Sequence, residues 1–245
     1  MTKLSVNLNK LALLRNARGK NEPDPIAFGR KALELGASGL TVHPRPDQRH
    51  ARYSDLPLLH ELVSQFPGAE FNIEGNPTPE LMAQVLQVKP HQCTLVPDEP
   101  GQLTSDHGWD AAAHHDFLVS VIERLKGEGI RASVFVDPDP KMVLPIAEVG
   151  ADRVELYTED YALSFGTENE SSVISNFRQT AEKALDLGMQ VNAGHDLTLL
   201  NLRKLIEEIP EIAEVSIGHA LTVEALQQGW ETTIQNYLEI LKPAA

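Results

Sequence analysis

The chain has 245 residues, of which 42% are hydrophobic and 23% are charged, a balance typical of a globular protein. Its formal net charge of −14 argues against general affinity for nucleic acid or an anionic membrane surface, although local arginines could still bind a small anion. The single cysteine, Cys93, excludes an internal disulfide framework. Because we find neither a basic leader with an apolar core nor a run near the roughly 18 apolar residues of a membrane span, we expect a cytoplasmic location.

Eight short apolar runs recur along the chain, and each ends at or beside a polar residue. Buried parallel strands have this appearance. The runs lie at 4–7, 40–43, 71–74, 93–96, 132–137, 153–157, 191–195 and 215–219. Polar residues at the ends of successive strands are what a site at the carboxyl ends of a barrel's strands requires.

Helix-like segments separate the runs. Ser54 and Thr78 are candidate N-caps, and Pro79 follows the second of them in the position that a helix start favours. Single glycines stand between a helix end and the next strand, where a left-handed residue is needed. These glycines are Gly36, Gly150 and Gly188. The expected helices are 25–35, 54–65, 78–87, 110–126, 139–148, 169–187, 198–208, 220–228 and 231–241.

Strand and helix alternate about eight times, which predicts an α/β protein, a (β/α)8 TIM barrel with extra helices, as one domain over residues 1–245. A doubly wound open sheet is the alternative. That fold usually has a glycine-rich turn after its first strand, and the segment Asn7-Leu8-Asn9-Lys10 has no glycine.

Three loops on the strand-exit side are candidates for substrate specificity. The segment 7–24 is long and basic, and the segment 43–53 is rich in arginine. The segment 97–109 contains Asp-Glu-Pro-Gly and is predicted to be a mobile lid.

His43 ends the second run, and Arg45, Arg49 and His50 follow it closely. This cluster is either a solvated loop or an anion site with a histidine base beside it, since arginine fits phosphate oxygens.

Two glutamates stand out. Glu74 ends the third run, where burial would raise its pKa and suit it to general acid–base work. Its alternative roles are a salt-bridge partner or a helix cap. Glu155 is flanked by apolar residues, so it either faces the barrel mouth or bonds to a neighbouring arginine or histidine.

His195 and His219 end the last two runs, each preceded by glycine, in the region where such barrels bind phosphate. Together with His43, these two histidines indicate one pocket that all three share. No His-x-His or His-Glu-x-x-His spacing is present, so we expect no metal site.

The motifs as a set resemble the pyridoxine 5′-phosphate synthase family, which closes the pyridine ring in the deoxyxylulose-dependent route to vitamin B6. The matching strings keep the family's order over almost the whole chain, and they are specific as a set although each alone is weak. They are Val6-Asn7, Leu14-Arg15-Asn16-Ala17-Arg18-Gly19, Thr41-Val42-His43, Asn72-Ile73-Glu74, Lys89-Pro90-His91, Val191-Asn192-Ala193-Gly194-His195 and Ile217-Gly218-His219-Ala220.

The resemblance implies a homo-octamer that condenses 3-amino-2-oxopropyl phosphate with 1-deoxy-D-xylulose 5-phosphate, a transferase reaction. The products would be pyridoxine 5′-phosphate, inorganic phosphate and water. No metal and no organic cofactor are implied.

Residue by residue, His43 and Glu74 match proton acceptors of the family, and His195 matches its proton donor. Glu155 matches a supporting polar residue inside the barrel. Contacts to the aminoketone phosphate are implied for Asn7, Arg18, Gly218 and His219, and contacts to the deoxyxylulose phosphate for Arg45, His50 and Thr104.

The chain departs from the family pattern at two places. Asn9 and Lys10 stand where the family commonly has an aspartate and a histidine that contact the sugar substrate. Asp196, a candidate substrate-binding residue, follows His195 where glycine is common. Its carboxylate would repel a nearby phosphate unless it turns away or caps the next helix. The departures keep open a phosphate-ligand-binding barrel of the same family without turnover or with another substrate. A separate alternative is another phosphosugar isomerase or aldolase, although a Schiff-base aldolase would need a lysine inside a strand and no run here presents one.

Overall fold

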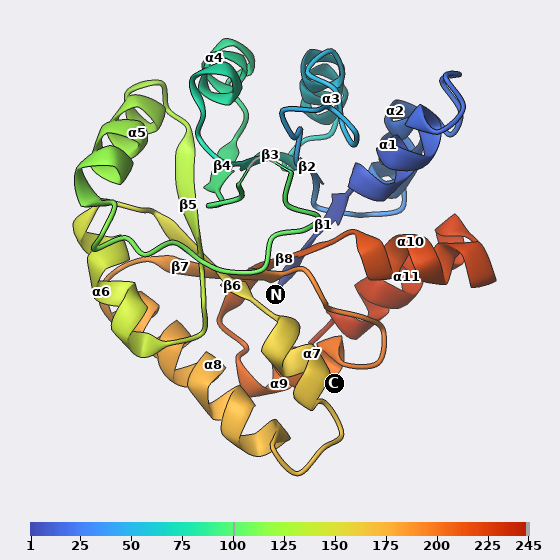
Figure 1. Ribbon diagram of the computed structural model, residues 1–245. Helices are drawn as coiled ribbons and strands as arrows, with labels where there is room; N and C mark the ends of the chain where they lie inside the picture. Colours follow the sequence, from blue (N-terminus) through green and yellow to red (C-terminus); the bar gives the residue numbers. More distant parts are fainter. Residues whose placement is uncertain (100, 244–245) are drawn as a thin grey trace.

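In the computed structural model, which describes residues 1–99 and 101–243, eight parallel strands close into a barrel (Figure 1). β1 pairs with both β2 and β8, which closes the cylinder. The predicted TIM barrel is confirmed, and the open sheet is wrong. The strands are β1 (Lys3–Asn7), β2 (Gly39–Val42), β3 (Glu70–Gly75), β4 (Gln92–Leu95), β5 (Arg131–Val136), β6 (Arg153–Tyr157), β7 (Gln190–Gly194) and β8 (Ile212–Ile217).

Helices surround the barrel on its outer side (Figure 1). Within the described ranges, none of them is both long and apolar enough to cross a bilayer. The helices are α1 (Asn9–Asn16), α2 (Pro25–Glu34), α3 (Asp55–Ser64), α4 (Pro79–Val88), α5 (His115–Gly127), α6 (Pro140–Glu148), α7 (Glu159–Ser164), α8 (Glu170–Asp186), α9 (Leu202–Glu208), α10 (His219–Gln228) and α11 (Trp230–Ile240).

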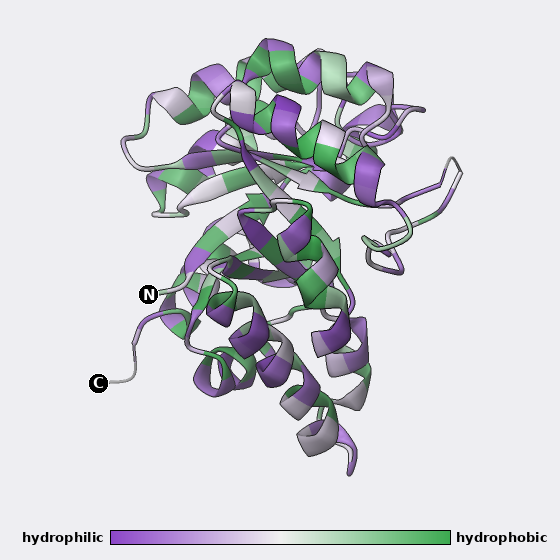
Figure 2. Ribbon diagram, turned by 90° about the vertical axis from the view of Figure 1, so that its left-hand side faces the viewer, coloured by the Kyte–Doolittle hydropathy of each residue, from purple (hydrophilic) through white to green (hydrophobic). Residues whose placement is uncertain are grey.

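The strands have one apolar face and one polar face. On β3, Phe71 and Ile73 belong to the hydrophobic core shared with the helices, whose hydrophobic and hydrophilic stretches alternate in Figure 2. Asn72, the residue between them, points into the barrel, where it bonds to the Thr41 and Thr94 hydroxyls. The interior of the barrel is therefore lined by hydrogen-bonded polar side chains, and they lead up to the carboxyl ends of the strands.

Helix α1 corrects the expected loop over 7–24. Its buried residues Leu11, Ala12 and Arg15 lie on one side of the helix, although no side chain caps its start. Arg15 was expected to be one of the loop's basic groups. Its guanidinium is instead buried and makes two hydrogen bonds of 2.8 Å to the Asp55 carboxylate. Arg15 is therefore a structural residue that fastens α1 to α3.

Other boundaries also differ from the expectation. α7 was not predicted, and α5 begins at His115 rather than at residue 110. α9 begins at Leu202 rather than at residue 198, because the Thr198 and Asn201 side chains accept backbone N–H bonds in a preceding turn. Thr78 caps α4 as predicted, whereas Ser54 makes no capping bond to α3. All three predicted glycines adopt left-handed backbone angles.

Candidate active site

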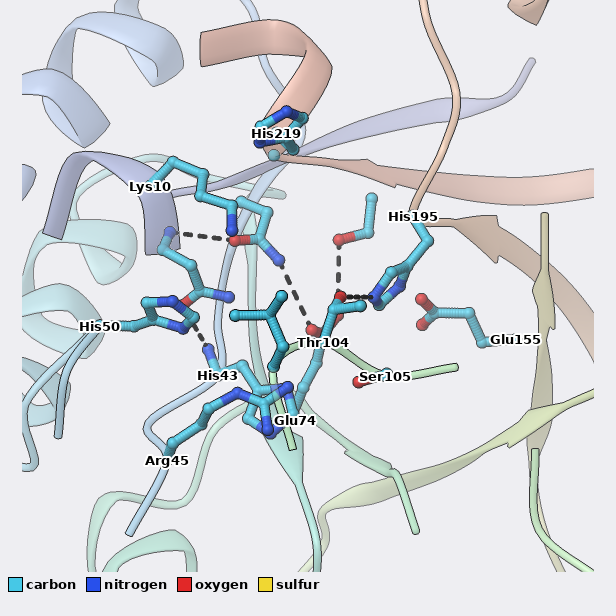
Figure 3. Close-up of a pocket in the computed structure, with 15 residues that line it drawn as sticks. Lys10, His43, Arg45, His50, Glu74, Thr104, Ser105, Glu155, His195 and His219 are labelled. Carbon is cyan, nitrogen blue, oxygen red and sulfur yellow. Dashed lines mark hydrogen bonds between the residues drawn. The ribbon is translucent and has the colours of Figure 1, made fainter. Parts of the chain in front are cut away.

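A cavity opens at the carboxyl ends of the strands and encloses about 550 Å³, counting the part open to solvent. Lys10 and His50 lie on one side of it, and His195 and Glu155 lie on the other (Figure 3). The loop that follows β4 crosses the barrel in Figure 1 and supplies part of the wall. The other lining residues are Asn7, Asn9, His43, Arg45, Glu74, Leu103, Thr104, Ser105, Ser216, Gly218 and His219.

His43 directly follows β2, and its imidazole is buried. Its backbone N–H donates to Asn9 Oδ1 over 2.8 Å, which fixes the chain at this point. Burial, followed by the nearby guanidinium of Arg45, lowers the pKa of His43 well below its ordinary value. The ring is therefore neutral near pH 7 and is able to accept a proton.

Glu74 projects from β3 into the buried base of the cavity. Ser216 Oγ donates to its carboxyl group over 3.4 Å, and Asn7 Nδ2 donates over 3.5 Å. Burial, followed by the neighbouring carboxyl of Glu155, raises the pKa of Glu74 well above its ordinary value. Among the described residues Glu74 forms no salt bridge and caps no helix, so those two alternatives are wrong.

His195 follows β7 with a φ of 99°, a left-handed conformation that is uncommon outside glycine. Its ring packs against the rings of Phe135 and Tyr157, with centroids 5.4 and 5.7 Å away. Its Nε2 lies 3.5 Å from Thr104 Oγ1. Burial, followed by Arg45, lowers the pKa of His195 to about 4. Such strained backbone commonly occurs at functional sites, where packing holds a side chain in place.

At the corner between β1 and β8, Gly218 packs closely against Asn7 and an uncapped helix begins. A Cβ on Gly218 would lie 3.0 Å from the Asn7 side chain, which leaves little room for any residue larger than glycine. Helix α10 begins at His219, and no side chain caps its first turn. The free N–H groups of an uncapped helix start form an anion site.

Cationic side chains line the side of the cavity nearest β2. Arg45 Nη2 lies 2.6 Å from Asp98 Oδ2, and its Nη1 donates to the Gln102 carbonyl over 3.2 Å. Burial, followed by the charge of Lys10, lowers the pKa of His50 to about 4. Burial, followed by Arg45, lowers the pKa of Lys10. The group suits a ligand with more than one negative charge.

Glu155 faces the cavity, the first of the two placements expected for it, and its carboxyl accepts from Thr94 Oγ1 over 3.5 Å. Burial, followed by the carboxyl of Glu214, raises the pKa of Glu155 to about 8. Across the described ranges, no three histidine, cysteine or acidic side chains are grouped so that they could hold a metal ion.

Two predicted site residues lie away from the cavity. Arg18 is exposed beyond the end of α1. Asp196 is half-buried, and its carboxylate forms no hydrogen bond with the described residues, so the capping role is wrong. Thr198 and Asn201 bond to the backbone ahead of α9 instead. The remaining predicted site residues all line the cavity.

Several lining residues were not among the predicted site residues. Asn9 positions the His43 backbone, Lys10 adds a cation, and Ser216 bonds to Glu74. Ser216 lies two residues before Gly218 on the inward face of β8, so the period-2 alternation of strands could have indicated it. No local signal marks Asp98, because Arg45 and His43 reach it from the loop after β2.

Comparisons with known proteins show the family of this chain. Residues 4–243 match the family described as Pyridoxal phosphate biosynthesis protein PdxJ. A pyridoxine 5′-phosphate synthase of Bacteroides fragilis (strain YCH46) is 52% identical over 242 residues, which cover 99% of this chain and 100% of that protein. One of Agrobacterium fabrum is 52% identical over 241 residues, which cover 97% and 96% of the two chains.

Solved structures at low identity support the fold alone. A tryptophan synthase from M. tuberculosis superposes with a TM-score of 0.66 at 12% identity, covering 99% of this chain and 93% of that one. A protein from Aquifex aeolicus VF5 superposes with a TM-score of 0.66 at 14% identity, covering 99% of this chain and 93% of that one. The family match spans nearly all of the barrel and the relatives are matched at full length, so this chain belongs to the PdxJ family.

Proposed function

We propose that this chain is a pyridoxine 5′-phosphate synthase that condenses 3-amino-2-oxopropyl phosphate with 1-deoxy-D-xylulose 5-phosphate. The observation that carries the proposal is that one cavity holds two kinds of group able to transfer protons, a carboxyl and two imidazoles. Burial favours the protonated carboxyl of Glu74 and the neutral rings of His43 and His195. Near neutral pH a protonated carboxyl can give a proton, and a neutral imidazole can accept one.

The condensation requires this combination. The amine nitrogen attacks the ketone carbon, and water leaves as the imine forms. Phosphate leaves before the ring closes, and a second net water is lost as the ring becomes aromatic. His43 accepts protons released by the nitrogen and by the ring carbons, and Glu74 relays protons at the base of the cavity. His195, on the other side of the cavity, donates to the departing oxygen once it has taken up a proton. These are the roles that the chemistry needs from groups on both sides of the substrates.

The two phosphates need separate binding points. The start of α10, with Gly218 and His219, is suited to the aminoketone phosphate. Arg45 and His50 are suited to the deoxyxylulose phosphate, together with the Thr104 hydroxyl on the loop after β4. Fixing both phosphates brings the reacting carbons together and lowers the entropy cost of the condensation.

The test supplies both substrates to the purified protein and follows pyridine absorbance and phosphate release together. We expect both signals to rise in a one-to-one ratio. Glu74→Gln should reduce turnover by about 10²- to 10⁴-fold with an unchanged circular dichroism spectrum. Glu123→Gln, which removes an exposed carboxylate from α5, should leave turnover unchanged. Ligand binding without product would instead establish a non-catalytic relative, and near-normal turnover of Glu74→Gln would remove Glu74 from the mechanism.

We further propose a homo-octamer. The proposal is supported by an apolar hollow of about 950 Å³ between α1 and α10, beside the active-site cavity. Leu13, Leu14 and Leu226 there are 40%, 49% and 76% exposed, an unfavourable arrangement for an isolated barrel. Light scattering should give eight chains per particle, and Leu226→Glu should give smaller particles. An unchanged mass for Leu226→Glu would exclude this surface as an interface.

A further inference from the structure

Asp98 lies on the loop after β4, and its side chain is only 4% exposed. Its Oδ2 is 2.6 Å from Arg45 Nη2 and 3.7 Å from His43 Nε2. One carboxylate therefore contacts both the arginine and the histidine that follow β2. A buried carboxylate in this position pairs with the charge of the guanidinium and favours the protonated form of the imidazole.

Bonds from two loops hold Asp98 in this position. Ser105 Oγ donates to its Oδ2 over 2.8 Å, and Asn76 Nδ2 donates to its backbone carbonyl over 2.9 Å. Its other oxygen, Oδ1, is buried and has no hydrogen-bond partner among the described residues. The carboxylate is thus fixed in place but keeps acceptor capacity, which a buried polar atom normally uses.

We propose that Asp98 is a positioning residue, which holds the Arg45 guanidinium at the cavity wall and stabilises the imidazolium that His43 becomes on accepting a proton. The proposal rests on the proposed function, in which His43 is a base. It also explains how the loop after β4 is linked to that base, since Ser105 lines the cavity and bonds to Asp98.

The charges around His43 make such a partner necessary. The guanidinium groups of Arg45 and Arg49 oppose the protonation of His43, and burial raises the pKa of Glu74 on β3 well above its ordinary value. Within the described ranges, Asp98 is the acidic residue at ion-pair distance from the ring. The groups facing His43 are Arg45, Arg49 and His50 from its own loop, Lys10 from α1, His195 after β7, Glu74 and Asp98.

The kinetic test replaces Asp98 by asparagine, with Glu99→Gln as the matched control because it removes an exposed carboxylate from the same loop. Asp98→Asn should reduce kcat about 10-fold, short of the roughly 10²- to 10⁴-fold cost of losing a general base. It should also move the acid limb of the kcat/KM profile to lower pH by about one unit, since an opposite charge within about 4–6 Å shifts a pKa by about 1–3 units. A fall in kcat with an unmoved limb would mean a merely structural role and would overturn the proposal.

A second readout does not depend on turnover. An NMR titration of the His43 ring, assigned with His43→Asn, should give a pKa about one unit lower in Asp98→Asn than in the wild type. Asp98→Glu should restore the wild-type value, and Glu99→Gln should not change it. Asp98→Ser serves as a second neutral replacement if the asparagine variant does not fold. Equal His43 pKa values in the wild type and the neutral variants would overturn the inference, whereas failure of the wild type to form product would count against the proposed function alone.

Discussion

Replacing Glu155 by glutamine is expected to stabilise the protein at neutral and alkaline pH. The Glu155 side chain is 2% exposed inside the barrel, and burial, followed by Glu214, raises its pKa to about 8 from an ordinary value of 4.5. Glutamine has nearly the same shape, carries no charge at any pH, and can still accept the bond from Thr94.

The pKa difference sets the sign and size of the effect. Below pH 4.5 the carboxyl is protonated in both the folded and the unfolded chain, so its raised pKa puts the wild type at no disadvantage. Between pH 4.5 and about 8 only the unfolded chain releases the proton, and the wild type loses about 1.4 kcal/mol of stability per pH unit. At pH 7 this amounts to about 3 kcal/mol, from which an unpaired amide hydrogen subtracts about 1 kcal/mol.

The assay is urea unfolding of the wild type and Glu155→Gln at pH 5, 6, 7 and 8, with Glu123→Gln as the exposed control. The free energy of unfolding of Glu155→Gln should exceed that of the wild type by about 2 kcal/mol at pH 7, and the gap should widen up to pH 8. The gap should shrink toward pH 5, because the unfolded chain then keeps the Glu155 proton in a growing fraction of molecules. A gap independent of pH, or a variant less stable at pH 8, would refute this reasoning.

Three further changes have distinct expected outcomes. Asn9→Ala should lower the free energy of unfolding by about 1–2 kcal/mol and reduce turnover, because the backbone N–H of His43 loses its acceptor; urea unfolding and steady-state rates check both effects. Arg15→Met should lower the free energy of unfolding in urea by about 3–5 kcal/mol, because it leaves the buried Asp55 carboxylate unpaired. A further Asp55→Leu change should recover most of this loss, and a double variant no more stable than Arg15→Met would contradict this account. Gly194→Ala should cost about 1–3 kcal/mol in thermal unfolding, since the added Cβ would lie 2.9 Å from a backbone carbonyl oxygen of β8; an unchanged Tm would show that the barrel yields there.

Local features of the sequence determined much of the architecture. Short apolar runs and the glycines that follow helices act over a few residues, and they predicted all eight strands and the left-handed turns. Because parallel strands end at the same rim, the chemistry-bearing residues at those ends were expected to meet. His43, Glu74 and His195 do line one cavity.

Contacts between distant segments were decided only by the tertiary structure. The basic residues of segment 7–24 look alike in sequence, yet Arg15 is buried against Asp55 and Arg18 is exposed. Asp98 has no local signature, because Arg45 reaches it from another loop. The hydrogen bonds inside the barrel likewise join residues of different strands, which meet only in the folded chain. Desolvation and opposing charges, which set the pKa values of the site, depend on positions in space rather than on spacing along the chain.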